Sequence, residues 1–233
     1  MDKLKKISVK PFLNMNLIPE CSDSEGKDLY PLYLQITYNR KNTQIRSKYG
    51  MYYESLNDPA IRNIIFFECS LAEKLVRYEI NNTKKEYTLA GLGGRYEVYA
   101  TSIRIVIGDY LKDKLQFELK KTNSPFYDIL NFKNKRKYFE DFYNASLLLF
   151  KDFNKKTSTE FKYEVNIYQI YRDFEPISMG GYNFPTIIDW VYGNYKQQFE
   201  QKLVRVLKNN SQIDKTIEFV DKLIHARLQT IKK

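Results

Sequence analysis

An alternation of apolar and polar side chains over residues 30–50, YPLYLQITYNRKNTQIRSKYG, constrains the fold of this chain more than any other stretch. Such an alternation is typical of strands that bury one face. The polar run Asn-Arg-Lys-Asn interrupts it. We therefore expect two antiparallel strands joined by a tight turn that is centred on Arg40 and Lys41, with Asn39 facing Asn42.

The expected pairing gives the hairpin two different faces. The core face holds four opposed pairs: Tyr38 with Thr43, Ile36 with Ile45, Leu34 with Ser47 and Leu32 with Tyr49. The other face is rich in hydrogen-bonding groups, and its members are Tyr33, Gln35, Thr37, Gln44, Arg46 and Lys48, with Arg40 and Lys41 at the tip. Any loop with an even number of residues centred here leaves these faces unchanged, because the side-chain period of a strand is two.

A polar, basic ribbon of this kind suits duplex DNA. The major groove admits a two-stranded β-ribbon, and arginine, lysine and glutamine bind base edges and phosphates there. The 233-residue chain has 38 Lys and Arg against 28 Asp and Glu, a net charge of +10, which favours nucleic acid ahead of an anionic membrane surface. Twenty tyrosines add groups that stack on bases, although an AT-rich genome also enriches tyrosine. The alternative is an ordinary solvent-facing sheet with edge charges.

The stretch DLYPLYLQITYNRKNTQIRSKYGMYY resembles the N-terminal arm-binding domain of tyrosine recombinases, the phage-type integrases of mobile elements. Residues 30–41 and 44–50 match the two hairpin strands of that family, KISVKPFLN matches its first strand, and residues 71–80 match the helix behind the sheet. The resemblance covers a third of the chain. It implies a small sheet inserted in the major groove, with Tyr33, Gln35, Thr37, Gln44, Arg46 and Lys48 as the reading face.

The catalytic residues of that family have no counterpart in this chain. The only histidine, His225, lies in His-Ala-Arg, one residue short of the His-x-x-Arg of recombinases. Carboxylates are scattered without a paired acid and base, and two cysteines with one histidine form no metal-ligand pattern. We therefore expect no enzymatic activity, no metal and no cofactor.

The remaining chain predicts an α+β fold: a small antiparallel sheet with a packing helix in the N-terminal half and a mostly helical C-terminal half. Residues 6–17 are expected to form an edge strand because they contain Pro11. Asn123, Ser124 and Pro125 mark a boundary between domains of residues 1–122 and 123–233. The other expected elements are helices at 58–80, 126–153, 186–208 and 212–232, a strand-like run at 91–111 with Ile103, Ile105 and Ile107 on one side, and a possible strand at 161–174.

Three other stretches have competing interpretations. The basic run Lys133, Lys135, Arg136 and Lys137 is either a patch that contacts the DNA backbone, extended by Lys151, Lys155 and Lys156, or the solvated face of an aromatic helix. The sequence GLGGR at 91–95 lacks the spacing of a phosphate loop and favours a turn. Tyr163, Tyr168 and Tyr171 fit core and rim packing better than a base-stacking platform, and Trp190 is expected to anchor the core.

The sequence thus predicts a non-catalytic DNA-binding protein of a mobile element or phage, with a duplex favoured over RNA. Another protein of the same element is a possible partner, and a membrane is not. The start of the chain has no secretory signal and no run is long enough to span a bilayer, so we expect a cytoplasmic location. Two alternatives stay open: an RNA-binding protein, and an assembly subunit without affinity for nucleic acid.

Overall fold

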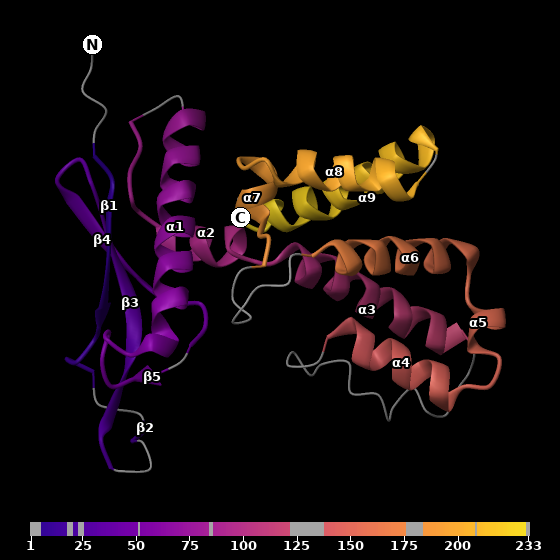
Figure 1. Cartoon of the computed structure of the whole chain (residues 1–233), viewed down its shortest axis with the longest axis horizontal. Helices are drawn as coiled ribbons and strands as arrows, with labels where there is room; N and C mark the ends of the chain where they lie inside the picture. The colour runs from indigo at the N-terminus through magenta and orange to yellow at the C-terminus, as the bar shows by residue number, and fades with distance from the viewer. Residues whose placement is uncertain are drawn as a thin grey trace. The chain divides into compact units, whose positions relative to one another are not determined.

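The computed structural model describes residues 6–17, 21–22, 26–50, 52–83, 86–121, 138–175, 184–207 and 209–231 (Figure 1). It confirms the α+β class, with an antiparallel sheet followed by helices. The chain forms two compact units: unit 1 is Met1–Ala100 with Ile177–Asn194, and unit 2 is Thr101–Pro176 with Tyr195–Lys233. This division differs from the expected one between residues 122 and 123, because unit 1 ends at Ala100 and includes a second, later segment.

All the described strands of unit 1 pair with one central strand. β3 (Asp28–Tyr38) lies between β1 (Ser8–Leu13) and β4 (Lys41–Arg46), and all three are antiparallel. The first half of β3 also pairs with β2 (Cys21–Ser22) and β5 (Tyr52–Tyr53). Among the described strands β1 has only β3 as partner, which confirms the edge position expected from Pro11.

The turn of the hairpin lies one residue earlier than predicted. Tyr38 pairs with Lys41, and the two turn residues Asn39 and Arg40 have φ of 49° and 63°. Two consecutive positive φ angles are those of a type I′ turn, and asparagine tolerates this conformation better than most residues. The predicted register is therefore wrong by two residues, yet the two faces are those expected, because a shift of two preserves the alternation.

The core face of the sheet packs against helices. Leu34 and Ile36 are 0% exposed, and they form one cluster with Leu71 and Leu75 of α1 (Pro59–Asn82). Two shorter helices, α2 (Leu92–Tyr99) and α7 (Ile187–Val191), add Tyr96 and Ile188 to the same cluster. Figure 1 shows α1 lying across one face of the sheet. The helix predicted over 58–80 is thus confirmed as a single element, and Trp190 is buried as expected.

The strand-like run predicted over 91–111 is wrong, because this stretch is helical. It contains α2 and the start of α3 (Ile103–Lys121). The alternation of isoleucines covers only five residues, whereas the helical spacing of apolar residues continues along the whole of α3. The buried residues with that spacing are Ile103, Val106, Ile107, Leu111, Leu115 and Leu119. Ile105 is 36% exposed, as its place between these positions requires. The turn predicted over GLGGR at 91–95 is limited to Gly91, with φ of 68°, because residues 92–95 form the start of α2.

The described secondary-structure elements of unit 2 are all helices. The helices after α3 are α4 (Phe139–Leu149), α5 (Phe153–Lys156), α6 (Thr159–Phe174), α8 (Tyr195–Val206) and α9 (Asn210–Gln229). α3 packs against α4, α6 and α9, and α9 also packs against α8. The expected helix over 186–208 is two helices, α7 and α8, and only α8 belongs to this unit.

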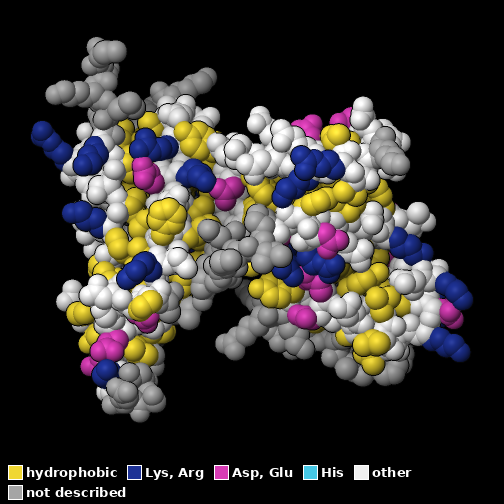
Figure 2. All heavy atoms as spheres, viewed as in Figure 1, with side chains coloured by type: hydrophobic (Ala, Val, Ile, Leu, Met, Phe, Trp, Pro, Cys, Tyr) yellow, Lys and Arg dark blue, Asp and Glu magenta, His cyan; other side chains and the backbone are white. Residues whose placement is uncertain are grey.

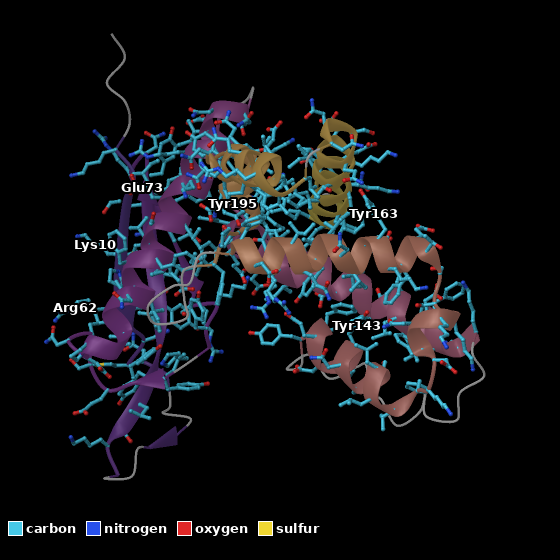
Figure 3. All side chains as sticks on the ribbon, turned by 45° about the vertical axis from the view of Figure 1, so that its right-hand side comes forward. Lys10, Arg62, Glu73, Tyr143, Tyr163 and Tyr195 are labelled. Carbon is cyan, nitrogen blue, oxygen red and sulfur yellow. The ribbon has the colours of Figure 1, made fainter. Side chains whose placement is uncertain are left out.

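The possible strand at 161–174 is also wrong, because these residues form most of α6. The Ser158 hydroxyl accepts a hydrogen bond from the Phe161 amide at 3.2 Å, which caps the helix. Tyr168 and Tyr171 are fully buried, as the core interpretation predicted. Tyr168 meets Phe139 edge to face at 5.2 Å between ring centroids, and Tyr143, labelled in Figure 3, stacks on Phe139 at 5.4 Å. Among the described helices of both units, none combines the length and apolar character of a membrane span.

Candidate nucleic-acid interface

The strand face opposite α1 forms a regular array of side chains, which we call the outer face. The pairing registers of β1, β3 and β4 place these side chains in three rows. The tip row is Ser8, Thr37 and Asn42, the middle row is Lys10, Gln35 and Gln44, and the aromatic row is Phe12, Tyr33 and Arg46. Every one of these side chains is exposed or half-exposed. Lys10, labelled in Figure 3, lies at the outer side of the sheet.

Five of the predicted reading residues share this face. They are Tyr33, Gln35, Thr37, Gln44 and Arg46. The residues that β1 adds to the outer face, above all Lys10 and Phe12, were not predicted from the sequence. Their alternation around Val9 and Pro11 was visible, but the long connection between β1 and β3 does not fix the register that brings them beside Gln35 and Tyr33.

Lys48 does not belong to the outer face. β4 ends at Arg46, and the side-chain alternation stops with it. The Lys48 ammonium donates a hydrogen bond to the Ala100 carbonyl at 2.5 Å, just beyond α2. A cation at that place satisfies a carbonyl at the negative end of the helix dipole. Its contact is therefore structural in the described protein.

A buried carboxylate fixes the chain where it leaves β4. Glu68 of α1 is 1% exposed, and its Oε1 accepts from the Lys48 amide at 2.7 Å and from the Tyr96 hydroxyl at 3.2 Å. Burial raises the pKa of Glu68, and this outweighs the hydrogen bonds and the Lys48 charge that lower it. The carboxylate joins β4, α1 and α2, so the base of the hairpin is held by the helices behind it.

At the other end of the hairpin, Arg40 and Lys41 have different positions. Arg40 is the second turn residue and is exposed at the tip. Lys41 is the first residue of β4 and lies opposite Tyr38, on the side of the sheet that carries the core. The tip expected from Arg40 and Lys41 is formed instead by Asn39 and Arg40. Asn39 donates from its amide to Glu86 Oε1 at 3.4 Å.

The aromatic row has its own cluster of rings. Phe12 and Tyr33 face each other across β1 and β3 with ring centroids 5.7 Å apart. The Arg46 guanidinium lies 5.7 Å from the centre of the Tyr52 ring and donates to the Tyr52 hydroxyl at 2.9 Å. Phe12, Tyr33 and Tyr52 are all half-exposed. These contacts hold Arg46 in one orientation while leaving its other N–H groups to bind elsewhere.

The charged side chains of the outer face itself, Lys10 and Arg46, are both basic, while Glu86 accepts a hydrogen bond from Asn39 at the tip. No Asp or Glu occurs in β1 or between Leu29 and Gly50, where Arg40, Lys41, Arg46 and Lys48 are found. In Figure 2, Lys and Arg side chains follow the edge of unit 1 that carries the sheet (left), while Asp and Glu lie further in and at the lower end. The larger part of the chain's basic excess, however, lies in the residues of unit 2.

None of the remaining predicted positions that the structure describes belongs to the outer face. Lys133, Lys135, Arg136 and Lys137 lie outside the described residues. Lys151, Lys155 and Lys156 are exposed around α5. Arg95, considered for phosphate contact, forms an ion pair with Glu79 at 2.6 Å and donates to the Ala90 carbonyl.

Within the ranges that the structure describes, no group of three or more His, Cys, Asp or Glu side chains could hold a metal ion. No protein-family model, no curated protein and no solved structure matches the chain.

Proposed function

We propose that this chain is a non-catalytic protein that binds duplex DNA by placing the outer face of its sheet in the major groove. The setting that fits the resemblance to arm-binding domains is a mobile element or a phage, and the corresponding location is the cytoplasm. The carrying observation is the middle row: Lys10, Gln35 and Gln44 stand side by side on one exposed face, and no Asp or Glu occurs in β1, in β4 or in β3 after Asp28.

The dimensions of the outer face support a groove as its binding site. Neighbouring strands lie about 4.8 Å apart, so the axes of β1 and β4 are separated by roughly 10 Å. The major groove is about 12 Å wide and about 8.5 Å deep. The side chains of β3 would face the groove floor and those of β1 and β4 the two walls. Glutamine pairs with adenine, and arginine and lysine pair with guanine, through the donors and acceptors of the base edges.

The unequal distribution of charge suggests a division of tasks between the two units. Contacts with phosphates supply most of the affinity for DNA, whereas contacts with base edges supply the specificity. The outer face has few cations but several groups suited to base edges. Unit 2 holds most of the basic excess, so we assign the backbone contacts mainly to it.

Fluorescence anisotropy of a labelled duplex over a salt series tests the proposal. The test variant is Lys10→Ala/Arg46→Ala, which removes two cations of the outer face. The control is Arg62→Ala/Arg77→Ala, which removes two exposed cations of α1, on the core side of the sheet. Each phosphate contact contributes about −0.9 to the slope of log K against log salt concentration.

We expect the outer-face variant to bind more weakly and with a slope flatter by up to about 1.8, for two lost phosphate contacts. If its cations contact bases instead, affinity falls and the slope changes less. The α1 variant should match the wild type, apart from a small effect of net charge. Equal loss in both variants, or no binding by the wild type at low salt, contradicts the proposal.

One observation favours RNA as a second candidate ligand. Half-exposed rings on an open sheet, here Phe12, Tyr33 and Tyr52, are suited to stacking on unpaired bases. A single-stranded RNA competitor in the same assay separates the two ligands. Displacement of the duplex at far lower RNA concentration than unlabelled duplex requires would favour RNA. Binding to neither leaves an assembly subunit as the remaining alternative.

A further inference from the structure

The aromatic row differs in chemistry from the two polar rows beside it. Both polar rows present hydroxyl, amide and ammonium groups, which bind base edges and phosphates. The aromatic row presents Phe12 and Tyr33, with Arg46 held over Tyr52. Aromatic rings and guanidinium planes bind the flat faces of bases. In a closed duplex those faces are stacked on one another and are not available.

The rows are also separated along the strands. Successive rows are two residues apart, or about 6.6 Å, so the aromatic row lies about 13 Å from the tip row. With β1, β3 and β4 running along the groove, that distance corresponds to roughly four base pairs at about 3.4 Å each. The polar rows and the aromatic row would therefore face different nucleotides of the same DNA.

We propose that the aromatic row stacks on unpaired bases, so that the preferred ligand is a duplex with an adjoining single-stranded segment. This inference rests on the proposed function, because it uses the same face and adds the class of DNA. The polar rows bind the paired part through its groove. Phe12, Tyr33 and the Arg46–Tyr52 pair bind the first nucleotides beyond the point where pairing ends.

The simpler interpretation is that Phe12 and Tyr33 only stabilise the sheet. Aromatic cross-strand pairs do so, and both rings are half-buried. A purely structural pair would affect the binding of every DNA to the same degree. A stacking surface would affect only DNA with unpaired bases. The ratio of two affinities therefore distinguishes them, and neither affinity alone does.

The experiment measures anisotropy with three labelled probes: a blunt duplex, the same duplex with a single-stranded thymine tail, and the tail alone. The variants are Phe12→Leu and Tyr33→Leu, which keep apolar bulk for the sheet but lose the ring. Tyr33→Phe keeps the ring and serves as the conservative control. Gln44→Ala removes an exposed side chain of the middle row, and circular dichroism checks that each variant is folded.

For the wild type we expect the tail to raise affinity by about fivefold or more for each stacked base. Phe12→Leu and Tyr33→Leu should abolish most of that gain and lower the affinity for the blunt duplex by a much smaller factor. Tyr33→Phe should retain the gain, and Gln44→Ala should weaken blunt and tailed duplexes equally.

Failure of the inference and failure of the proposed function give different results. Blunt-duplex binding that the tail does not improve overturns the inference alone, as does an equal loss on blunt and tailed duplexes in both leucine variants. Binding to the tail without binding to the blunt duplex overturns the duplex proposal and supports the stacking surface. If the wild type binds none of the three probes, both are overturned.

Discussion

Arg40 occupies a backbone conformation that glycine would adopt at lower cost. It is the second residue of the type I′ turn, with φ of 63°. For a residue with a Cβ, the left-handed region costs about 1–2 kcal/mol. Replacing Arg40 by glycine removes that cost but gives the unfolded chain more freedom, which costs roughly 0.5–1 kcal/mol. We therefore expect Arg40→Gly to raise the free energy of unfolding by about 0.5–1 kcal/mol.

In a melting experiment on the full chain this gain corresponds to about 1–4 °C, since about 1 kcal/mol shifts Tm by roughly 2–4 °C in a protein of this size. Circular dichroism or calorimetry measures it. The same variant should bind DNA more weakly, because the tip loses its charge. Arg40→Gln is the matched control: glutamine removes the charge but has no special tolerance of the left-handed region, so the strain at this position is retained.

The stability and the DNA binding of Arg40→Gly together show whether the strain at Arg40 serves DNA binding. A more stable protein that binds DNA less well would mean that the chain tolerates strain at the tip to keep a cation there. A less stable Arg40→Gly protein would refute the reasoning about the turn. Greater stability with unchanged DNA binding would retain the turn and remove Arg40 from the interface.

Three further predictions concern the folded framework, two in unit 1, which carries the outer face, and one in unit 2. Because the pKa of Glu68 is raised in the folded state, its contribution to stability is fully present below about pH 4.5 and lost as pH rises through the folded-state pKa. Each pKa unit of that shift lowers the free energy of unfolding of the wild type by about 1.4 kcal/mol once Glu68 is ionised. In urea titrations the stability of Glu68→Gln relative to the wild type should therefore improve between pH 4 and pH 8. A stability difference that does not change with pH would exclude this role of Glu68. Leu34→Ala should lower the free energy of unfolding by about 2–5 kcal/mol in the same titrations, since Leu34 is 0% exposed on the core face of β3. A loss below about 1 kcal/mol would contradict its burial. Ser158→Ala should cost about 0.5–2 kcal/mol, because it removes the cap of α6 and the hydroxyl that donates to Glu118, and Ser158→Thr is the control that keeps the hydroxyl.

The features that follow from local alternation were predictable from sequence. The two faces of the hairpin depend only on whether a position is odd or even, so they survived a turn placed one residue too late. The helix over 58–80 was predictable for a similar reason, since Leu71, Leu75 and Val76 continue one apolar stripe.

Contacts between distant segments were not predictable in the same way. Lys10 and Phe12 join the outer face through a register that only the folded sheet defines. Lys48 lies off that face because β4 ends two residues before it and its ammonium donates a hydrogen bond to the carbonyl of Ala100, the C-cap residue of α2. In α3, Ile103 and Ile107 satisfy a strand pattern and a helix pattern alike over so short a window, and only the longer stripe to Leu119 decides between them.

The dependence of every described strand on β3 has a consequence for how the binding surface comes into being. β1, β2, β4 and β5 make their described ladders with β3 and not with one another. Unfolding of β3 therefore leaves the others without a partner. Each of the three rows includes a residue of β3, so loss of β3 removes all three rows at once, whereas loss of the edge strand β1 alone would leave the members on β3 and β4 in place. Amide hydrogens of β3 should accordingly exchange at the rate of global unfolding of the sheet.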